Sequence, residues 1–478
     1  MAERATCWSD EKLRALFDGA ADFNIRVLRI CGQTLYTYAI DGLTSGGDIS
    51  DFVFKPLAER LQGDSMQALY QNALDGVVYN SVADACEDLD AAAHKLVNGF
   101  CVVLFPGVGA IAFEDKTSEK RSPSAPEVEN TVKGAKDAFT ETIRTNTSLI
   151  RRHLRTPALR IFETVVGERT LTNVGVLSVE GLTDPELVAR VKARLASLQI
   201  EGLLSPAAVE EYVTGSRRTA FPLLQYTERT DKFCQGLLAG RVGLLVDGLP
   251  LGYLLPVDLA YLMTSPEDTG MGYMAASCVR VLRYAALLLS LFLPALYAAM
   301  AAFHQQMIPT KLLLAIIESK EFVPFPTVFE VLSLLVAFEL LQEAGLSLPQ
   351  SIGQTVSIIG GLVVGTAAVE AKLVSPAALI VVSIAGICGF VLPGKDFSDA
   401  IRIWRFVLAV CASLAGIFGV TLGALVLLVH LAGLSSMGLA YLDPFADVAG
   451  TSKLVRPRLV TQKLRDPRLH PQDLRKQR

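Results

Sequence analysis

Hydrophobic residues are distributed unevenly along the chain. Residues 1–280 mix apolar and charged positions as ordinary soluble sequence does, whereas residues 284–432 consist mostly of Leu, Ile, Val, Ala, Gly and Phe. A helix needs about 20 apolar residues to cross the hydrocarbon core of a bilayer. Four stretches qualify or nearly qualify, namely 284–303 (with a kink expected at Pro294), 351–371, 376–393 and 405–431.

A fifth apolar stretch, 327–345, carries three glutamates, Glu330, Glu339 and Glu343. A carboxylate at the centre of a bilayer costs about 2.5 kcal/mol or more, and residues four apart share a helix face. Two interpretations stay open: an amphipathic helix that lies at the interface or packs on the bundle, or a helix that turns its acids towards a water-filled path near a pore. The pattern thus predicts an α-helical integral membrane domain over 281–435, with four to five transmembrane helices.

The stretch 351–371 contains two stripes at helical spacing. Small residues recur every four positions and would let helix backbones approach closely; they are Gly353, Ser357, Gly361 and Gly365. A second stripe mixes hydroxyls, apolar residues and an acid, and consists of Thr355, Ile359, Leu362, Thr366 and Glu370. Packing inside one bundle would explain both stripes. Alternatively, several copies of the chain pack through the glycines and turn the second stripe to a central pore, where apolar rings gate and a ring of carboxylates favours cations.

Strand and helix patterns alternate in the soluble region, which predicts an α/β or α+β fold. Residues 24–42, 100–115 and 240–257 each show two apolar runs around a turn. Asp184 and Pro185 mark a helix start as N-cap and first residue. The segment 116–131 is polar and rich in proline and serine, which predicts a linker. The expected parts of this region are a first subdomain over 1–120, a linker over 121–131 and a second subdomain over 132–280.

A basic stretch with helical spacing, 132–160, opens the second part. It holds a cluster of arginines, Arg144, Arg151, Arg152 and Arg155. A solvated face is the expectation for this cluster, and contact with a partner subunit or lipid headgroups is the alternative.

The net charge of −4 conceals a basic tail within 436–478. Residues 451–478 hold nine Lys or Arg and two acids, a charge of +7, so the remainder carries −11. Together with Arg280 and Arg283 before the first apolar stretch, this tail predicts cytoplasmic flanks at both ends and hence an even number of crossings.

Nothing in the sequence predicts catalysis. The five histidines are isolated, the eight cysteines show no CxxC spacing, and HExxH, GxSxG and P-loop motifs are lacking. We therefore expect no enzymatic activity, no cofactor, no metal site and no nucleic-acid partner.

Ten sequence motifs, taken together and in order, are distinctive. The motifs are YAIDGL (38–43), FTETIRTNTSLIRRHLR (139–155), EGLTDPELV (180–188), FPLLQYTERTDK (221–232), GRVGLLVDGLP (240–250), SPED (265–268), LLLSLFLPALYAA (287–299), PFPTVFE (324–330), IGQTVSIIGGLVVGTAAVEAKLVSP (352–376) and YLDPFA (441–446). They resemble the A subunits of spore germination receptors, the GerA family, including its close SpoVAF-type paralogues. The match covers most of the chain in the expected order, although the tail from 451 matches only as a generic basic segment.

The resemblance implies a multi-pass protein of the spore inner membrane with a two-part cytosolic N-terminal region. It implies partners: a permease-like B subunit that binds the nutrient germinant, and a lipoprotein C subunit. It further implies oligomerisation, as a pentamer, into a germinant-gated channel for monovalent cations that triggers germination. The alternatives are a SpoVAF-type ion channel that amplifies germination, or a non-conducting membrane scaffold or signal transducer.

Overall fold

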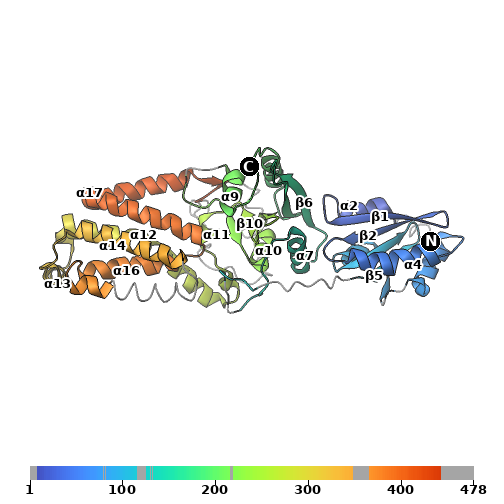
Figure 1. The fold of residues 1–478 in the computed structure, drawn as a ribbon, viewed down its shortest axis with the longest axis horizontal. Helices are drawn as coiled ribbons and strands as arrows, with labels where there is room; N and C mark the ends of the chain where they lie inside the picture. The colour runs from blue at the N-terminus through green and yellow to red at the C-terminus, as the bar shows by residue number, and fades with distance from the viewer. Residues whose placement is uncertain are drawn as a thin grey trace. The chain divides into compact units, whose positions relative to one another are not determined.

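The computed structural model describes residues 8–78, 80, 82–115, 125–129, 131, 133–215, 219–347 and 365–442 (Figure 1). These residues form two compact units. The sheet unit contains the described residues up to 215 together with 224–256, and the helical unit contains 219–223 and 257–442. Residues 257–280 thus belong with the helices.

The first sheet of the sheet unit has five antiparallel strands in the order β1-β2-β4-β5-β3. Side chains alternate between the two faces of a strand. Val102 and Leu104 of β4 therefore join one core with helices α2 and α6, while Val103 and Phe105 join the other with α4 and α5. The sheet lies between two helical layers. Its elements are β1 (Phe23–Ile30), β2 (Gln33–Ile40), β3 (Ala83–Cys86), β4 (Phe100–Phe105), β5 (Gly109–Glu114), α2 (Asp10–Leu16), α3 (Gly46–Asp48), η1 (Ile49–Phe54), α4 (Lys55–Arg60), α5 (Met66–Asn72), η2 (Ala73–Val77) and α6 (Leu89–Leu96).

The second sheet repeats the connectivity of the first. Its antiparallel order β6-β7-β9-β10-β8, counted from its own first strand, matches that of the first sheet strand for strand. In both sheets a helix comes just before the strand that is fourth in chain order, and a glycine with positive φ lies between the helix and that strand (Gly99, Gly240). The strand then forms a hairpin whose turn contains another such glycine (Gly107, Gly248). The elements are β6 (Leu159–Val166), β7 (Thr172–Val179), β8 (Gln225–Thr227), β9 (Val242–Val246), β10 (Gly252–Leu255), α7 (Ile143–His153), α8 (Pro185–Ala196), α9 (Pro206–Thr214) and α10 (Thr230–Leu238).

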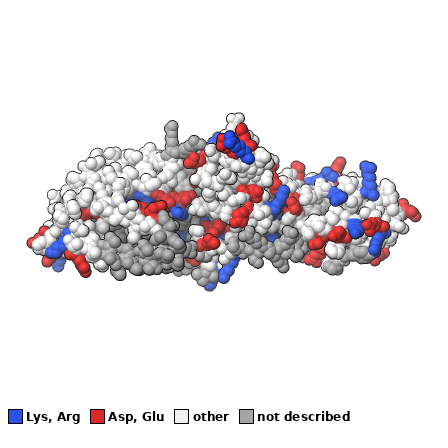
Figure 2. Space-filling view, viewed as in Figure 1, with Lys and Arg blue, Asp and Glu red and all other residues white. Residues whose placement is uncertain are grey.

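In the helical unit the long helix α12 contacts α14, α16 and α17. Among the described residues, α12 and α17 are long and apolar enough to cross a membrane, and α16 is a shorter apolar helix. On the face shown in Figure 2, charged side chains are dense over the sheet unit and sparse over the helices. The elements are α11 (Leu259–Leu262), η3 (Pro266–Thr269), α12 (Tyr273–Phe303), η4 (Gln305–Met307), α13 (Thr310–Lys320), α14 (Thr327–Ser347), α16 (Pro376–Phe390), α17 (Lys395–Gly433), β11 (Ser435–Ser436) and β12 (Leu439–Ala440).

Helix α17 reverses direction in its middle. Ala415 and Gly416 leave the helical conformation, Gly416 with φ +58° and ψ −137°. A Cβ placed on Gly419 would clash with the carbonyl oxygen of Cys411, so the two arms pack closely. The rings of Trp404 and His430 lie 5.8 Å apart, although 26 residues of straight helix would separate them by about 39 Å. The arms, 395–414 and 417–433, are therefore antiparallel.

Several sequence-based predictions are confirmed. The runs 24–42, 100–115 and 240–257 form the hairpins β1-β2, β4-β5 and β9-β10. Asp184 caps α8, its carboxylate accepting from the Glu186 amide. Since every strand pairing in the two five-stranded sheets is antiparallel, the sheet unit is α+β rather than α/β.

Two predictions are wrong. The basic stretch 132–160 is helical only over Ile143–His153 and becomes strand β6 at Leu159, because Pro157 disfavours helix in the residue before it. The single helix expected over 405–431 is a hairpin, because one glycine permits a reversal that an unbroken apolar pattern conceals.

Candidate functional site

A buried carboxylate joins three helices of the helical unit. Glu330, in the first turn of α14, has no exposed surface. Its Oε2 accepts hydrogen bonds from Ser375, from the amide at 3.0 Å and the hydroxyl at 2.7 Å. Its Oε1 lies 2.8 Å from Nζ of Lys320, the last residue of α13. Ser375 is the N-cap of α16, so the carboxylate also lies at the positive end of that helix.

A second carboxylate on α14 binds two arginines of α17. Glu339 accepts from Nε of Arg402 at 2.8 Å and from Nη2 of Arg405 at 3.0 Å. Arg405 is 2% exposed and also donates to the carbonyl of Ala385 in α16. Leaving such a charge buried without its partner costs about 3–5 kcal/mol. Glu343, one turn further along α14, is exposed.

The three acids predicted near a pore thus differ in their surroundings. Glu330 and Glu339 are held in ion pairs within the chain, and α14 packs on α12, α16 and α17. Nothing near the glutamates in the sequence indicates their basic partners, because Lys320 lies on another helix and Arg402 and Arg405 lie more than 60 residues away.

A third charged cluster lies at the start of α12. Arg280 and Arg283 are buried and donate to Oδ2 of Asp268 at 3.1 and 2.8 Å. Burial alone would raise the pKa of Asp268, but the hydrogen bonds and charges of the two arginines outweigh it and lower that pKa. The two arginines are therefore internal partners of Asp268, and the cytoplasmic flank predicted from them stays a prediction.

Most of the predicted pore stripe and glycine ridge lies outside the described residues, as does the basic tail. That applies to Gly353, Thr355, Ser357, Ile359, Gly361 and Leu362. Of the remainder, Gly365 faces α16, with Leu379 3.6 Å from where its Cβ would lie. Thr366 and Glu370 are exposed.

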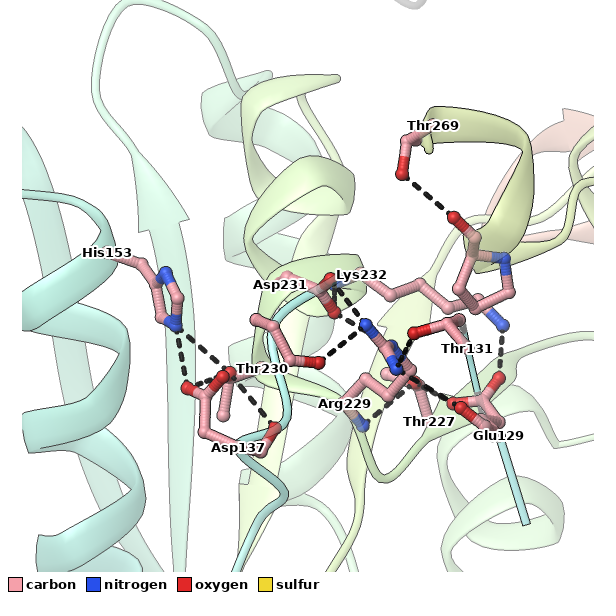
Figure 3. Close-up of polar contacts among 12 residues, drawn as sticks. Glu129, Thr131, Asp137, His153, Thr227, Arg229, Thr230, Asp231, Lys232 and Thr269 are labelled. Carbon is pink, nitrogen blue, oxygen red and sulfur yellow. Dashed lines mark hydrogen bonds and ion pairs between the residues drawn. The ribbon is translucent and has the colours of Figure 1, made fainter. Parts of the chain in front are cut away.

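In the sheet unit, charged residues at the start of α10 hold the end of the predicted linker and the segment that follows it (Figure 3). Arg229 is 1% exposed. It pairs with Asp231 at 2.7 Å and donates to the carbonyl oxygens of Ala135 (2.9 Å) and Glu129 (3.2 Å). Lys232 pairs with the Glu129 carboxylate at 2.6 Å. One buried guanidinium thus fixes a length of irregular backbone.

His153 completes this clamp from α7 (Figure 3). Its Nε2 lies 2.7 Å from Oδ2 of Asp137 and 3.1 Å from the hydroxyl of Thr230, which donates to the same carboxylate. The bond to Asp137 raises the pKa of His153. Burial raises the pKa of Asp137, but the bonds from His153 and Thr230 outweigh it and lower that pKa to about 2. The same ring nitrogen of His153, Nε2, contacts both Asp137 and Thr230. The three residues therefore hold the segment in place and do not form a catalytic chain in which a base activates a nucleophile.

A buried ion pair joins α7 to the segment before β1. Arg151, with no exposed surface, donates to both carboxylate oxygens of Asp22 at 2.8 Å. Arg144 pairs with Glu163 at 2.8 Å and lies 3.3 Å from Asp41. The solvated face expected for the arginine cluster is therefore wrong for Arg151, whose partner lies 129 residues away.

The fold therefore combines a region of two similar antiparallel sheets with a helical region that buries ion pairs and contains helices long and apolar enough to cross a membrane. The family model "Bacillus/Clostridium GerA spore germination protein" matches residues 11–468. The chain belongs to the GerA family of spore germination proteins.

Relatives cover most of the chain. Spore germination protein XA of Bacillus anthracis is 36% identical over 98% of this chain and 96% of its own length, and spore germination protein KA of Bacillus subtilis is 34% identical over 89% and 79%. The uncharacterized membrane protein YfkQ of B. subtilis is 36% identical over 91% and 84%. Among solved structures, the N-terminal domain of the A subunit of the Bacillus megaterium spore germinant receptor GerK3 matches with a TM-score of 0.40 and 23% identity, over 51% of this chain and 91% of that one.

Proposed function

We propose that this chain is the A subunit of a nutrient germinant receptor in the spore inner membrane, and that several copies form a gated path for monovalent cations. The observation that carries the proposal is the family match over residues 11–468, shared with spore germination proteins of similar length. Opening of the path would release cations and trigger germination. The chain acts by assembly and permeation and catalyses no covalent reaction.

The helical unit has the surface that this proposal needs. Large apolar side chains on both arms of α17 face outward, including Leu414 at 78% and Phe418 at 71% exposed. Such surfaces suit lipid or neighbouring subunits. The buried Glu330 of α14 and the buried Arg405 of α17 are each in an ion pair, as charges among apolar helices must be.

The path would be lined by the stripe that contains Ile359 and Leu362, with subunits, as a pentamer, touching through the glycine ridge. The exposed side chains of Thr366 and Glu370 agree with an interface or pore surface at the end of this stripe. The permease-like B subunit and the lipoprotein C subunit would complete the receptor, with the sheet unit and the basic tail in the cytoplasm.

The test is cation flux through the purified full chain in liposomes. We expect K⁺ or Na⁺ flux that Ile359→Trp reduces at least tenfold, because a bulkier apolar ring closes a narrow pore. Ile387→Trp is the matched control, since Ile387 is 63% exposed on α16, outside the proposed stripe. Absence of flux in every oligomeric state, with and without the B and C subunits, would refute the proposal.

A second candidate is a SpoVAF-type channel that amplifies germination without a nutrient receptor of its own. It stays a candidate because a family match alone does not separate the two groups, and the relative YfkQ is named only as a membrane protein. Flux through the full chain that is the same with and without the B and C subunits and a germinant would support this candidate, whereas the first proposal expects the B and C subunits to make the flux depend on the germinant. A monomer or dimer without a water path would instead indicate a scaffold or signal transducer, and a mass measurement in detergent distinguishes that outcome.

A further inference from the structure

The buried carboxylate of Glu330 is surrounded by oxygen atoms that the established family role does not explain. Its Oε1 makes no hydrogen bond within the described residues and has only the ion pair to Lys320, at 2.8 Å. The Lys320 ammonium in turn donates to the hydroxyl of Thr327. The hydroxyl of Ser375 lies 2.7 Å from Oε2.

Tyr297 of α12 supplies a further oxygen. The residue is 7% exposed. Its buried hydroxyl makes no hydrogen bond of ordinary geometry among the described residues. Tyr297 packs in one apolar cluster with Ile316 of α13, Val331 of α14 and Ala378 of α16, so it lies among the helix segments that carry Lys320, Glu330 and Ser375. A buried hydroxyl without a hydrogen bond costs free energy, so its position in this cluster calls for an occupant that it can bind.

We propose that Glu330, Ser375, Thr327 and Tyr297 form a binding site for a monovalent cation, and that the Lys320 ammonium occupies this site as a tethered substitute. Carboxylate and hydroxyl oxygens are the ligands that hard cations prefer. An ammonium and a K⁺ or Na⁺ ion carry the same charge, so exchanging one for the other leaves the buried charge balanced. A bare carboxylate at this position would be costly.

The helix that carries the lysine is suited to moving. Within α13 only Ile316 is buried, and Lys320 at its end is 20% exposed. A cation that displaces the ammonium would release the end of α13 from α14 and α16. This links cation occupancy to the position of α13; its role in permeation rests on the proposed function, whereas the binding itself does not.

The first experiment measures whether cations compete with Lys320 in the unaltered full chain in detergent. Lysines are labelled with an amine-reactive reagent in KCl, in NaCl, or in N-methylglucamine chloride at equal ionic strength, and the labelled sites are quantified by mass spectrometry. We expect labelling of Lys320 to be about two- to threefold faster in KCl or NaCl, while exposed Lys311 on the same helix stays unchanged. Equal Lys320-to-Lys311 ratios in all three salts would overturn the proposal.

The second experiment removes the tethered charge. The unfolding midpoint of Lys320→Met should rise by about 3–6 °C when K⁺ or Na⁺ replaces N-methylglucamine. Lys311→Met and the double variant Lys320→Met/Glu330→Gln should show no such rise. The proposal is wrong if the single variant is insensitive to the cation, if the double variant is equally sensitive, or if the single variant fails to fold in every salt while the double variant folds.

The two proposals fail in different ways. Cation-dependent labelling without flux in liposomes would support the cation site and refute the proposed channel. Flux with no cation effect on the labelling of Lys320 would support the channel and refute the cation site.

Discussion

The reversal in α17 depends on one residue, and replacing Gly416 by alanine tests it. Gly416 has φ +58° and ψ −137°, a conformation that residues with a Cβ rarely adopt. The space is also occupied, because the added Cβ would lie 2.8 Å from Cε1 of His304 and 3.0 Å from Cβ of Phe303. The second atom is close to the backbone of α12 and cannot simply rotate away.

Two costs add to give the expected magnitude. Holding a residue with a Cβ in this conformation costs about 1–3 kcal/mol, and forcing a methyl group into a packed site costs about 1–3 kcal/mol. The sum of about 2–6 kcal/mol is a large part of a typical stability of about 5–15 kcal/mol. At about 2–4 °C per kcal/mol, the unfolding midpoint of Gly416→Ala should fall by at least about 4 °C.

The assay is thermal unfolding of the purified full chain in detergent, with Gly433→Ala as the matched control. Gly433 ends the same helix, and nothing lies within 4 Å of where its Cβ would be. The control should therefore unfold at the wild-type temperature or slightly above it. A Gly416→Ala midpoint equal to that of the control would refute the reasoning.

Cross-linking gives an independent check of the reversal. Short thiol cross-linkers should join Trp404→Cys to His430→Cys within one chain, because the native rings lie 5.8 Å apart. A continuous helix would hold these positions about 39 Å apart, and failure of the intrachain link would show that the hairpin does not form.

Three further predictions concern the ion pairs. Asp22→Asn should lower stability by about 3–5 kcal/mol in urea unfolding, because it leaves Arg151 buried beside a neutral group. Glu339→Gln should cost a similar amount, because two arginines of α17 lose their carboxylate. The clamp should protect the linker from proteolysis best between about pH 4 and 6.5. The pKa of His153 is raised, so its contribution to stability is present below about pH 6.5 and is lost as the pH rises through the folded pKa. The pKa of Asp137 is lowered, so its contribution is present above about pH 4 and is lost as the pH falls towards 2.

Controls for these changes come from exposed residues of the same type. Asp18→Asn and Glu318→Gln should each change stability by less than about 0.5 kcal/mol, as exposed substitutions usually do. His153→Gln should abolish the loss of protection at high pH. If the charge-removing changes match their controls, or if His153→Gln leaves the pH profile intact, the pairs do not stabilise the chain as argued.

Local signals in the sequence predicted local structure well. The hairpins and the Asp184 cap depend on neighbouring residues, and turn residues mark them directly. The apolar stretches also gave the positions of α12, α14 and α16. The membrane-crossing count and the pore stripe stay predictions.

What the sequence could not predict depends on distant partners or on a single backbone angle. Arg151 looked like one of several surface arginines, because nothing near it in the chain indicates Asp22. Gly416 looked like one of many glycines in an apolar run. His153, isolated in sequence, meets Asp137 only once α7 and the preceding segment have folded.

The short strands after α17 have a consequence for the chain's path. The Leu259 amide donates to the carbonyl of Tyr441, and the Val257 amide donates to the hydroxyl of Ser436. The residues that lead into α12 and those that leave α17 are thus hydrogen-bonded neighbours. If the helices cross a bilayer, the polypeptide must leave on the same side from which it set out, so any count of crossings between these two points has to be even.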